Sequence, residues 1–182
     1  MQVNRVAVAV VLVIALVVAG WWMFKRSSAG ESIDLVETFD TAEKRPADGT
    51  FEVIEADLNG DTRRAIFTEA PSRIIWPIRV PDDGWLRVAL GVKPEAWDQE
   101  GDGVQFRIGI SDGRQYEPLV TQLVNPFANK GDRRWIPVMI DLSPFSGEDV
   151  TLIFNTDNSP EGKGHDPRGD LALWGAPEIV VR

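Results

Sequence analysis

The sequence contains no cysteine and a single histidine among its 182 residues. The absence of cysteine excludes a disulfide scaffold, a thiolate zinc site, a cysteine nucleophile and a lipoprotein anchor. One histidine is too few for most zinc sites, which combine several histidines or cysteines. That residue, His165, lies in a long polar stretch, and no serine in a strand–elbow–helix context accompanies it. We therefore expect a chain that is not an enzyme and holds no cofactor.

Positive charge is also scarce. The chain has 19 basic and 28 acidic residues, which gives a net charge of −9. Three of the basic residues, Arg5, Lys25 and Arg26, come before residue 27. Residues 27–182 therefore carry 16 basic and 28 acidic residues, a net charge of −12. Binding to nucleic acid requires basic residues that neutralise phosphates, so we expect no nucleic-acid partner. The same acidity repels anionic glycans and lipids, and it favours a neutral sugar or a basic protein patch.

One segment lacks charge altogether. Residues 6–24 form an apolar run of 19 residues, long enough for a helix of about 28 Å, close to the thickness of the hydrocarbon core. A secretory signal peptide is the alternative, with cleavage after the small residues at 27–29, but bulky aromatic and basic residues precede that site. We expect an uncleaved single-pass anchor over residues 1–26, a linker over 27–32 and one domain over 33–182.

Two groups of residues in this segment suggest what surrounds it. The membrane-interface group, which fits an aromatic belt and the lipid phosphates, is Trp21, Trp22, Lys25 and Arg26. The helix-packing group, small enough for a neighbouring helix to approach, is Ala15, Ala19 and Gly20. The basic residues on the two sides are nearly balanced and slightly favour a cytoplasmic domain.

Beyond residue 32 the apolar residues alternate with period two, which predicts β-strands with one buried face. The alternating runs are 86–92, 104–110, 136–142 and 150–154, and a final strand is expected at 171–181. Turn residues separate them at 47–49, 59–61, 82–84, 101–103 and 111–113. Short strands at this spacing predict an all-β fold, an antiparallel β-sandwich of two sheets.

Four sequence segments occur in the order seen in a known family: 101–108, 134–143, 147–152 and 170–179. They contain a G-D-G strand, a D-L-S strand, a G-x-x-V-x-L strand and a final D-x-A-x-W strand. In this order the chain resembles the galactose-binding-like jelly rolls, especially the novel putative carbohydrate-binding module type, over residues 62–181. The resemblance implies a non-catalytic domain outside the cytoplasm, so we expect a periplasmic or other extracytoplasmic domain on the cytoplasmic membrane.

Exposed tryptophans are the candidate binding residues, because aromatic rings stack on sugars and dock proteins. Trp85 alternates with apolar strand residues, so it lies on the solvent face or at a strand end. Trp135 also alternates with apolar strand residues and so faces solvent, and Trp97 lies in a loop. Each can instead cover an edge of the sandwich. Trp76 shares a face with Ile74 and Ile78 and is expected in the core, and Trp174 is part of the family-like strand.

The acidic stretch 98–103 begins like a helix–loop–helix calcium loop. Its twelfth position is Gly109 instead of glutamate, and a strand follows instead of a helix, so this motif is rejected. Loop carboxylates can still bind Ca²⁺, and a solvated acidic loop is the alternative. The conceivable oxygen ligands are Asp98, Asp102, Asp166 and Asp170.

Two hypotheses of function follow. The first, which the anchor favours, is an accessory subunit that binds other membrane-protein subunits in a respiratory, photosynthetic or transport complex. The second is a membrane-tethered module that binds a neutral carbohydrate. The position of the exposed aromatic residues separates the two hypotheses. Aromatic residues spread over a flat patch continuous with the anchor would support the first, and aromatic residues clustered on one concave face would support the second.

Overall fold

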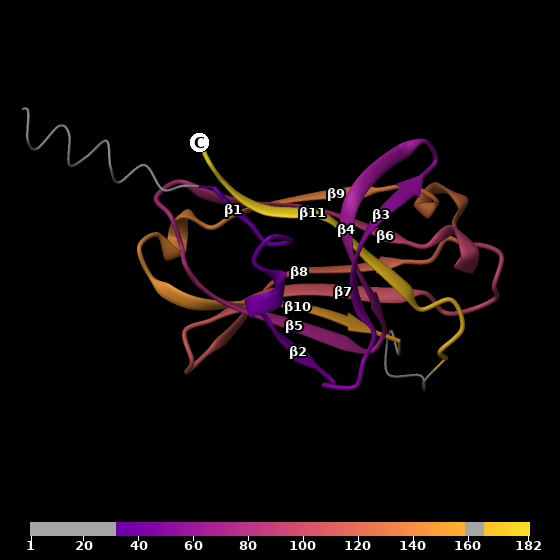
Figure 1. Cartoon of the computed structure of the whole chain (residues 1–182), viewed down its shortest axis with the longest axis horizontal. Coiled ribbons are helices and arrows are strands. Elements are labelled where there is room, and N and C mark those ends of the chain that lie inside the picture. The colour runs from indigo at the N-terminus through magenta and orange to yellow at the C-terminus, as the bar shows by residue number, and fades with distance from the viewer. Residues whose placement is uncertain (1–31, 159–165) are drawn as a thin grey trace, which may run out of the picture.

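The structure is a computed structural model that describes residues 32–158 and 166–182. Eleven strands and four short 3₁₀ helices form within these residues (Figure 1). The strands are β1 (Ile33–Asp34), β2 (Glu43–Arg45), β3 (Phe51–Leu58), β4 (Asp61–Glu69), β5 (Ser72–Arg79), β6 (Gly84–Val92), β7 (Val104–Ser111), β8 (Tyr116–Val124), β9 (Ile136–Asp141), β10 (Asp149–Asp157) and β11 (Leu171–Val181). The 3₁₀ helices are η1 (Phe39–Thr41), η2 (Pro94–Ala96), η3 (Lys130–Asp132) and η4 (Ser143–Phe145).

The strands form two layers that face each other, as Figure 1 shows. One sheet has the order β3-β4-β11-β6-β9, with β1 paired to β11. The other has the order β2-β5-β10-β7-β8. Every pairing is antiparallel. The all-β antiparallel sandwich expected from the sequence is therefore confirmed.

The core fills the space between the sheets with the apolar residues that alternate along each strand. At its centre Trp174 meets Phe106 edge to face, with ring centroids 4.9 Å apart, and lies 4.5 Å from Phe154. Phe154 in turn meets Trp76 edge to face at 5.1 Å. Trp76 and Trp174 are buried, as expected. This aromatic group links β5, β7, β10 and β11, and so it joins the two sheets.

A second, smaller apolar cluster covers the outer face of the six-stranded sheet. Trp135, from the loop before β9, packs there with Leu58, Phe67 and Leu173. Glycines make room for its ring: a Cβ on Gly175 would come within 2.6 Å of it. The outer face of this sheet is therefore partly closed by the protein itself, whereas the outer face of the five-stranded sheet carries the groove described below.

Several expected boundaries agree with the structure. The final strand runs over Leu171–Val181, and β7 covers the expected run 104–110. The turn residues at four of the five expected sites adopt positive φ: Asn59 and Gly60, Asp83, Gly103, and Gly113. These are positions where glycine, asparagine and aspartate are tolerated best.

The expected anchor over residues 6–24 lies outside the described residues, and so do its interface group (Trp21, Trp22, Lys25, Arg26) and its packing group (Ala15, Ala19, Gly20). Within residues 32–158 and 166–182, no helix combines the length and the apolar character that a membrane crossing needs.

Candidate ligand-binding groove

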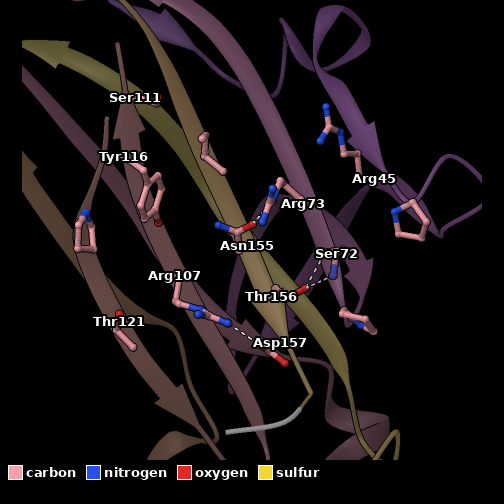
Figure 2. Close-up of a pocket in the computed structure, with 14 residues that line it drawn as sticks. Arg45, Ser72, Arg73, Arg107, Ser111, Tyr116, Thr121, Asn155, Thr156 and Asp157 are labelled. Carbon is pink, nitrogen blue, oxygen red and sulfur yellow. Dashed lines mark hydrogen bonds and ion pairs between the residues drawn. The ribbon is translucent and has the colours of Figure 1, made fainter. Parts of the chain in front are cut away.

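A groove of about 1020 Å³ lies over the five-stranded sheet, on the side away from the core (Figure 2). All five strands of that sheet contribute to it. Its lining residues are Arg45, Pro46, Pro71, Ser72, Arg73, Arg107, Ser111, Tyr116, Pro118, Thr121, Ile153, Asn155, Thr156 and Asp157.

The register of the sheet places one groove residue from each strand in a single line. Arg45 pairs with Arg73, Arg73 with Asn155, Asn155 with Arg107, and Arg107 with Thr121. We call these five residues the arginine row. Neighbouring strands lie about 4.8 Å apart, so the row crosses the whole sheet at right angles to its strands.

Hydrogen bonds hold the middle of the arginine row, as the dashed lines in Figure 2 show. Arg73 donates from Nε to Oδ1 of Asn155 at 2.6 Å. Arg107 forms an ion pair with Asp157 through Nη2, while its buried Nε has no hydrogen-bond partner among the described residues. At the edge of the sheet, Arg45 pairs with the exposed Glu43 at 2.5 Å. The guanidinium groups are therefore oriented, yet several of their donors have no partner in residues 32–158 and 166–182.

An apolar strip runs beside the arginine row. We define it by the groove residues Ile153, Pro118 and Tyr116. Ile153 and Pro118 both pair with Gly109 of β7, two residues along the strand from Arg107. The Tyr116 ring lies against Gly109, where an added Cβ would come within 2.4 Å of ring atoms. Tyr116 is 47% exposed, so it offers an aromatic surface next to the row.

A buried hydroxyl pair fixes one end of the groove where β5 begins. The Ser72 and Thr156 hydroxyls lie 2.6 Å apart, and Thr156 also accepts a hydrogen bond from the Ser72 backbone N–H at 3.1 Å. Because the two residues come from β5 and β10, this contact fixes the strands that carry Arg73 and Asn155.

The three tryptophans expected to bind a ligand do not line this groove. Trp135, expected to face solvent, is 4% exposed and donates from Nε1 to the Asp61 carbonyl at 2.8 Å, so this expectation of exposure is wrong. It fails because the loop before β9 folds back over the sheet. Trp97 is half-buried beside the same cluster and donates to the Val92 carbonyl. Trp85 is half-buried on β6, with Arg182 over its ring at 4.3 Å.

The acidic loop residues separate into two groups. Asp98 is paired with Arg133 at 2.8 Å, and it is not among the charges that shift the pKa values of the other three. Burial, together with the charges of Asp102 and Asp166, raises the pKa of Asp170 to about 7. Burial and the charge of Asp166 also raise the pKa of Asp102. A hydrogen bond from Arg168 instead lowers the pKa of Asp166.

Asp170 is 4% exposed, and neither of its Oδ atoms is in hydrogen-bond geometry with a described donor. The Asn158 side chain offers a weaker contact that lowers its pKa by a smaller amount. No set of three or more His, Asp or Glu side chains able to hold a metal ion occurs in the described residues. His165 lies outside them.

The groove contains residues that the sequence reasoning did not single out. Arg107 and Asn155 alternate in the sequence with the apolar residues Phe106 and Phe154, which indicates that they face away from the core. Alternation indicates on which face of the sheet these two side chains lie, but it does not show that they lie opposite each other on neighbouring strands. Tyr116 had no such signal, since β8 is largely exposed and does not alternate.

Comparisons with known proteins add the fold class. No protein-family model matches the chain. An uncharacterized protein of Archaeoglobus fulgidus is 37% identical over 103 residues, which make up 56% of this chain and 25% of that protein. The chain thus spans about a quarter of the length of this relative.

Solved structures resemble the chain over most of its length. The CBM51-2 and INT domains of Clostridium perfringens ZmpB match with a TM-score of 0.58 and 14% identity, over 82% of this chain and 31% of that one. CBM51 of Clostridium perfringens GH95, solved with methyl-galactose, matches with a TM-score of 0.53 and 16% identity, over 82% of this chain and 100% of that one. The CBM22-2 xylan-binding domain of Paenibacillus barcinonensis Xyn10C matches with a TM-score of 0.52 and 9% identity, over 84% of this chain and 99% of that one.

The fold is that of carbohydrate-binding modules. This agrees with the galactose-binding-like jelly roll that the sequence resembles. At these identities the likeness extends to the fold of the chain and not to its ligand.

Proposed function

We propose that this protein binds a glycan in the groove of its five-stranded sheet and does not hydrolyse it. The observation that carries the proposal is the pairing of an arginine row with an apolar strip on one sheet face. A sugar ring has apolar faces and a polar rim, so it needs both kinds of surface within one hollow. Tyr116 and Ile153 supply the apolar surface, and Asn155, Thr121 and the arginines supply hydrogen bonds.

The groove lining supports binding over hydrolysis. Most glycosidases use two carboxyl groups that flank the bond to be cleaved. Among the residues that line this groove, Asp157 is the single carboxylate, and it is paired with Arg107. A binding role also agrees with the fold, since the neighbours named above include a xylan-binding domain.

The groove favours the second sequence hypothesis, a glycan-binding module, over the first, an accessory subunit of a membrane complex. The expected anchor over residues 6–24 fits this proposal, because a tethered module outside the cytoplasm would hold a glycan at the cell surface. Residues Trp85, Trp97 and Trp135 then contribute to the stability of the domain rather than to glycan contact.

The proposal is tested by glycan-array binding of the full chain, purified in mild detergent. We expect Tyr116→Ala and Asn155→Ala to weaken binding about tenfold or more, equivalent to ~1.4 kcal/mol. Phe127→Ala is the matched control, because Phe127 is an aromatic residue of similar exposure, 44%, outside the groove. If no glycan binds, or if both groove variants bind like the unchanged chain, the proposal is wrong.

A further inference from the structure

The local charge of the groove is opposite to that of the whole chain. The chain carries a net charge of −9, yet the groove lining contains three arginines against one aspartate. The lining stays net positive when Glu43, which pairs with Arg45 at the edge of the sheet, is counted with it. At physiological ionic strength exposed charges farther away than about 8 Å are largely screened. A ligand in the groove therefore interacts with the arginine row more strongly than with the acidic remainder of the molecule.

Folding alone does not explain the positions of these arginines. Arg45 and Arg73 are directly opposite each other on β2 and β5, an arrangement that destabilises a sheet when the charges are alike. The Nε of Arg73 binds the neutral Asn155 amide, and none of the ion pairs found in the described residues involves Arg73. Glu43 already offsets the charge of Arg45 at the edge of the sheet, and an anion beside Arg73 would remove the repulsion that remains.

Arg107 adds a second guanidinium to the groove. Its side chain is 41% exposed and pairs with Asp157 through Nη2. Its Nε is buried, so a ligand would contact the exposed end of the guanidinium instead. The row thus presents two oriented guanidinium groups, on strands β5 and β7, on either side of Asn155.

We propose that the glycan is acidic, with the carboxylates of uronic acid residues bound by the arginine row and their ring faces on the apolar strip. This inference rests on the proposed function and names its ligand class. Guanidinium groups match planar carboxylates because they can donate two parallel hydrogen bonds. A polyuronate carries one carboxylate on every sugar, so a chain lying across the strands can use the row at more than one point.

The acidic ligand differs from the neutral sugar expected from overall charge. That expectation treated the negative charge of residues 27–182 as evenly distributed over the surface of the domain. The sheet register instead gathers Arg45, Arg73 and Arg107 on one face.

The test compares oligogalacturonate with the same oligosaccharide after chemical reduction of its carboxyl groups. Titration calorimetry on the full chain in detergent should show at least about tenfold tighter binding of the acidic form, with a preference that falls as salt is added. Arg73→Gln should remove most of this preference. Arg79→Gln, on the same strand but outside the groove lining and paired with Asp149, should leave it unchanged.

An added negative charge keeps the test decisive if Arg73→Gln fails to fold. Asn155→Asp preserves shape and can still accept the bond from Arg73, but it places a negative charge in the middle of the row. We expect it to weaken binding of the acidic oligosaccharide more than tenfold while changing binding of the reduced form little.

The outcomes separate the two proposals. Tighter binding of the reduced oligosaccharide, or equal loss of both forms in Asn155→Asp, would overturn the acidic ligand and leave glycan binding intact. Dextran sulfate bound as tightly as oligogalacturonate would overturn the assignment to carboxylates. Binding of neither oligosaccharide, together with a negative glycan array, would overturn glycan binding itself.

Discussion

Gly109 determines where the Tyr116 ring lies. Because glycine has no side chain, the ring can rest on β7, and a Cβ there would come as close as 2.3 Å to the Tyr116 hydroxyl oxygen. The clash involves the far end of a side chain, which can swing away without moving the backbone. The position of the ring is therefore sensitive to one methyl group, whereas the sheet is not.

Gly109→Ala should therefore weaken glycan binding with little loss of stability. We expect about tenfold weaker binding and a melting temperature close to that of the unchanged chain. Tyr116→Ala should weaken binding similarly, and the double variant should lose no more than Tyr116→Ala alone, because both changes remove one contact. Additive losses in calorimetry would show that Gly109 acts separately from Tyr116.

Asp170 makes folding stability depend on pH. Its pKa is about 7 in the folded protein against an ordinary value of 3.8, so the folded state holds its proton more tightly. The stability it contributes is fully present below about pH 4 and is lost as the pH rises through 7. Ionisation of Asp170 therefore destabilises the folded state at pH 8.

We expect Asp170→Asn to stabilise the protein at pH 8 by an amount on the order of 1–4 kcal/mol and to have little effect at pH 4. Urea unfolding of both chains at pH 4, 6 and 8 measures the difference. An effect of equal size at all three values would mean that ionisation of Asp170 is not the cause.

At the scale of elements, the loop before β9 is part of the structure of the six-stranded sheet. Trp135→Ala removes a ring that packs on Gly175 and the Nε1 hydrogen bond to Asp61. Loss of a buried tryptophan side chain costs about 3–5 kcal/mol. We expect this loss in urea unfolding, with glycan affinity unchanged under conditions where the variant is folded. Weaker binding by the folded variant would link the two sheets in function.

Elements with strict alternation were predictable, and the exceptions have local causes. β7 agrees because its apolar residues alternate along the sequence and are all buried. β11 is buried continuously over residues 172–175, and its bounds agree with those of the final strand in the family-like order. β8 escaped prediction because it is an edge strand with a bulge opposite β7, between Ile108 and Gly109, and most of its side chains are exposed. The alternation that placed Trp135 on the solvent face applies to β9, whereas Trp135 itself precedes the strand.

The alignment of the groove was beyond local sequence signals. Alternation correctly directed Arg107 and Asn155 away from the core. It could not show that Arg45 and Arg73 would lie in the same line, since that depends on the strand order β2-β5-β10-β7-β8 and on the register of each pair. Residues separated by more than a hundred positions meet there through long-range pairing.

For the whole molecule, the anchor over residues 6–24 stays a prediction. Its uncharged length and its aromatic and basic flank predict that the protein remains in membranes after an alkaline carbonate wash. If it is extracytoplasmic, protease added to spheroplasts should digest residues 31–182. Recovery of a soluble protein that begins near residue 30 would contradict the anchor, and digestion only in inverted vesicles would place the domain in the cytoplasm.

The arginine row begins on β2 and ends on β8, the two edge strands of its sheet. A site that runs from edge to edge does not have to receive the end of a polymer, so it can hold an internal stretch of a long chain. One polysaccharide strand could then bridge several copies of the protein. Each further attachment would be intramolecular, so weak individual contacts would combine into strong avidity on a crowded surface.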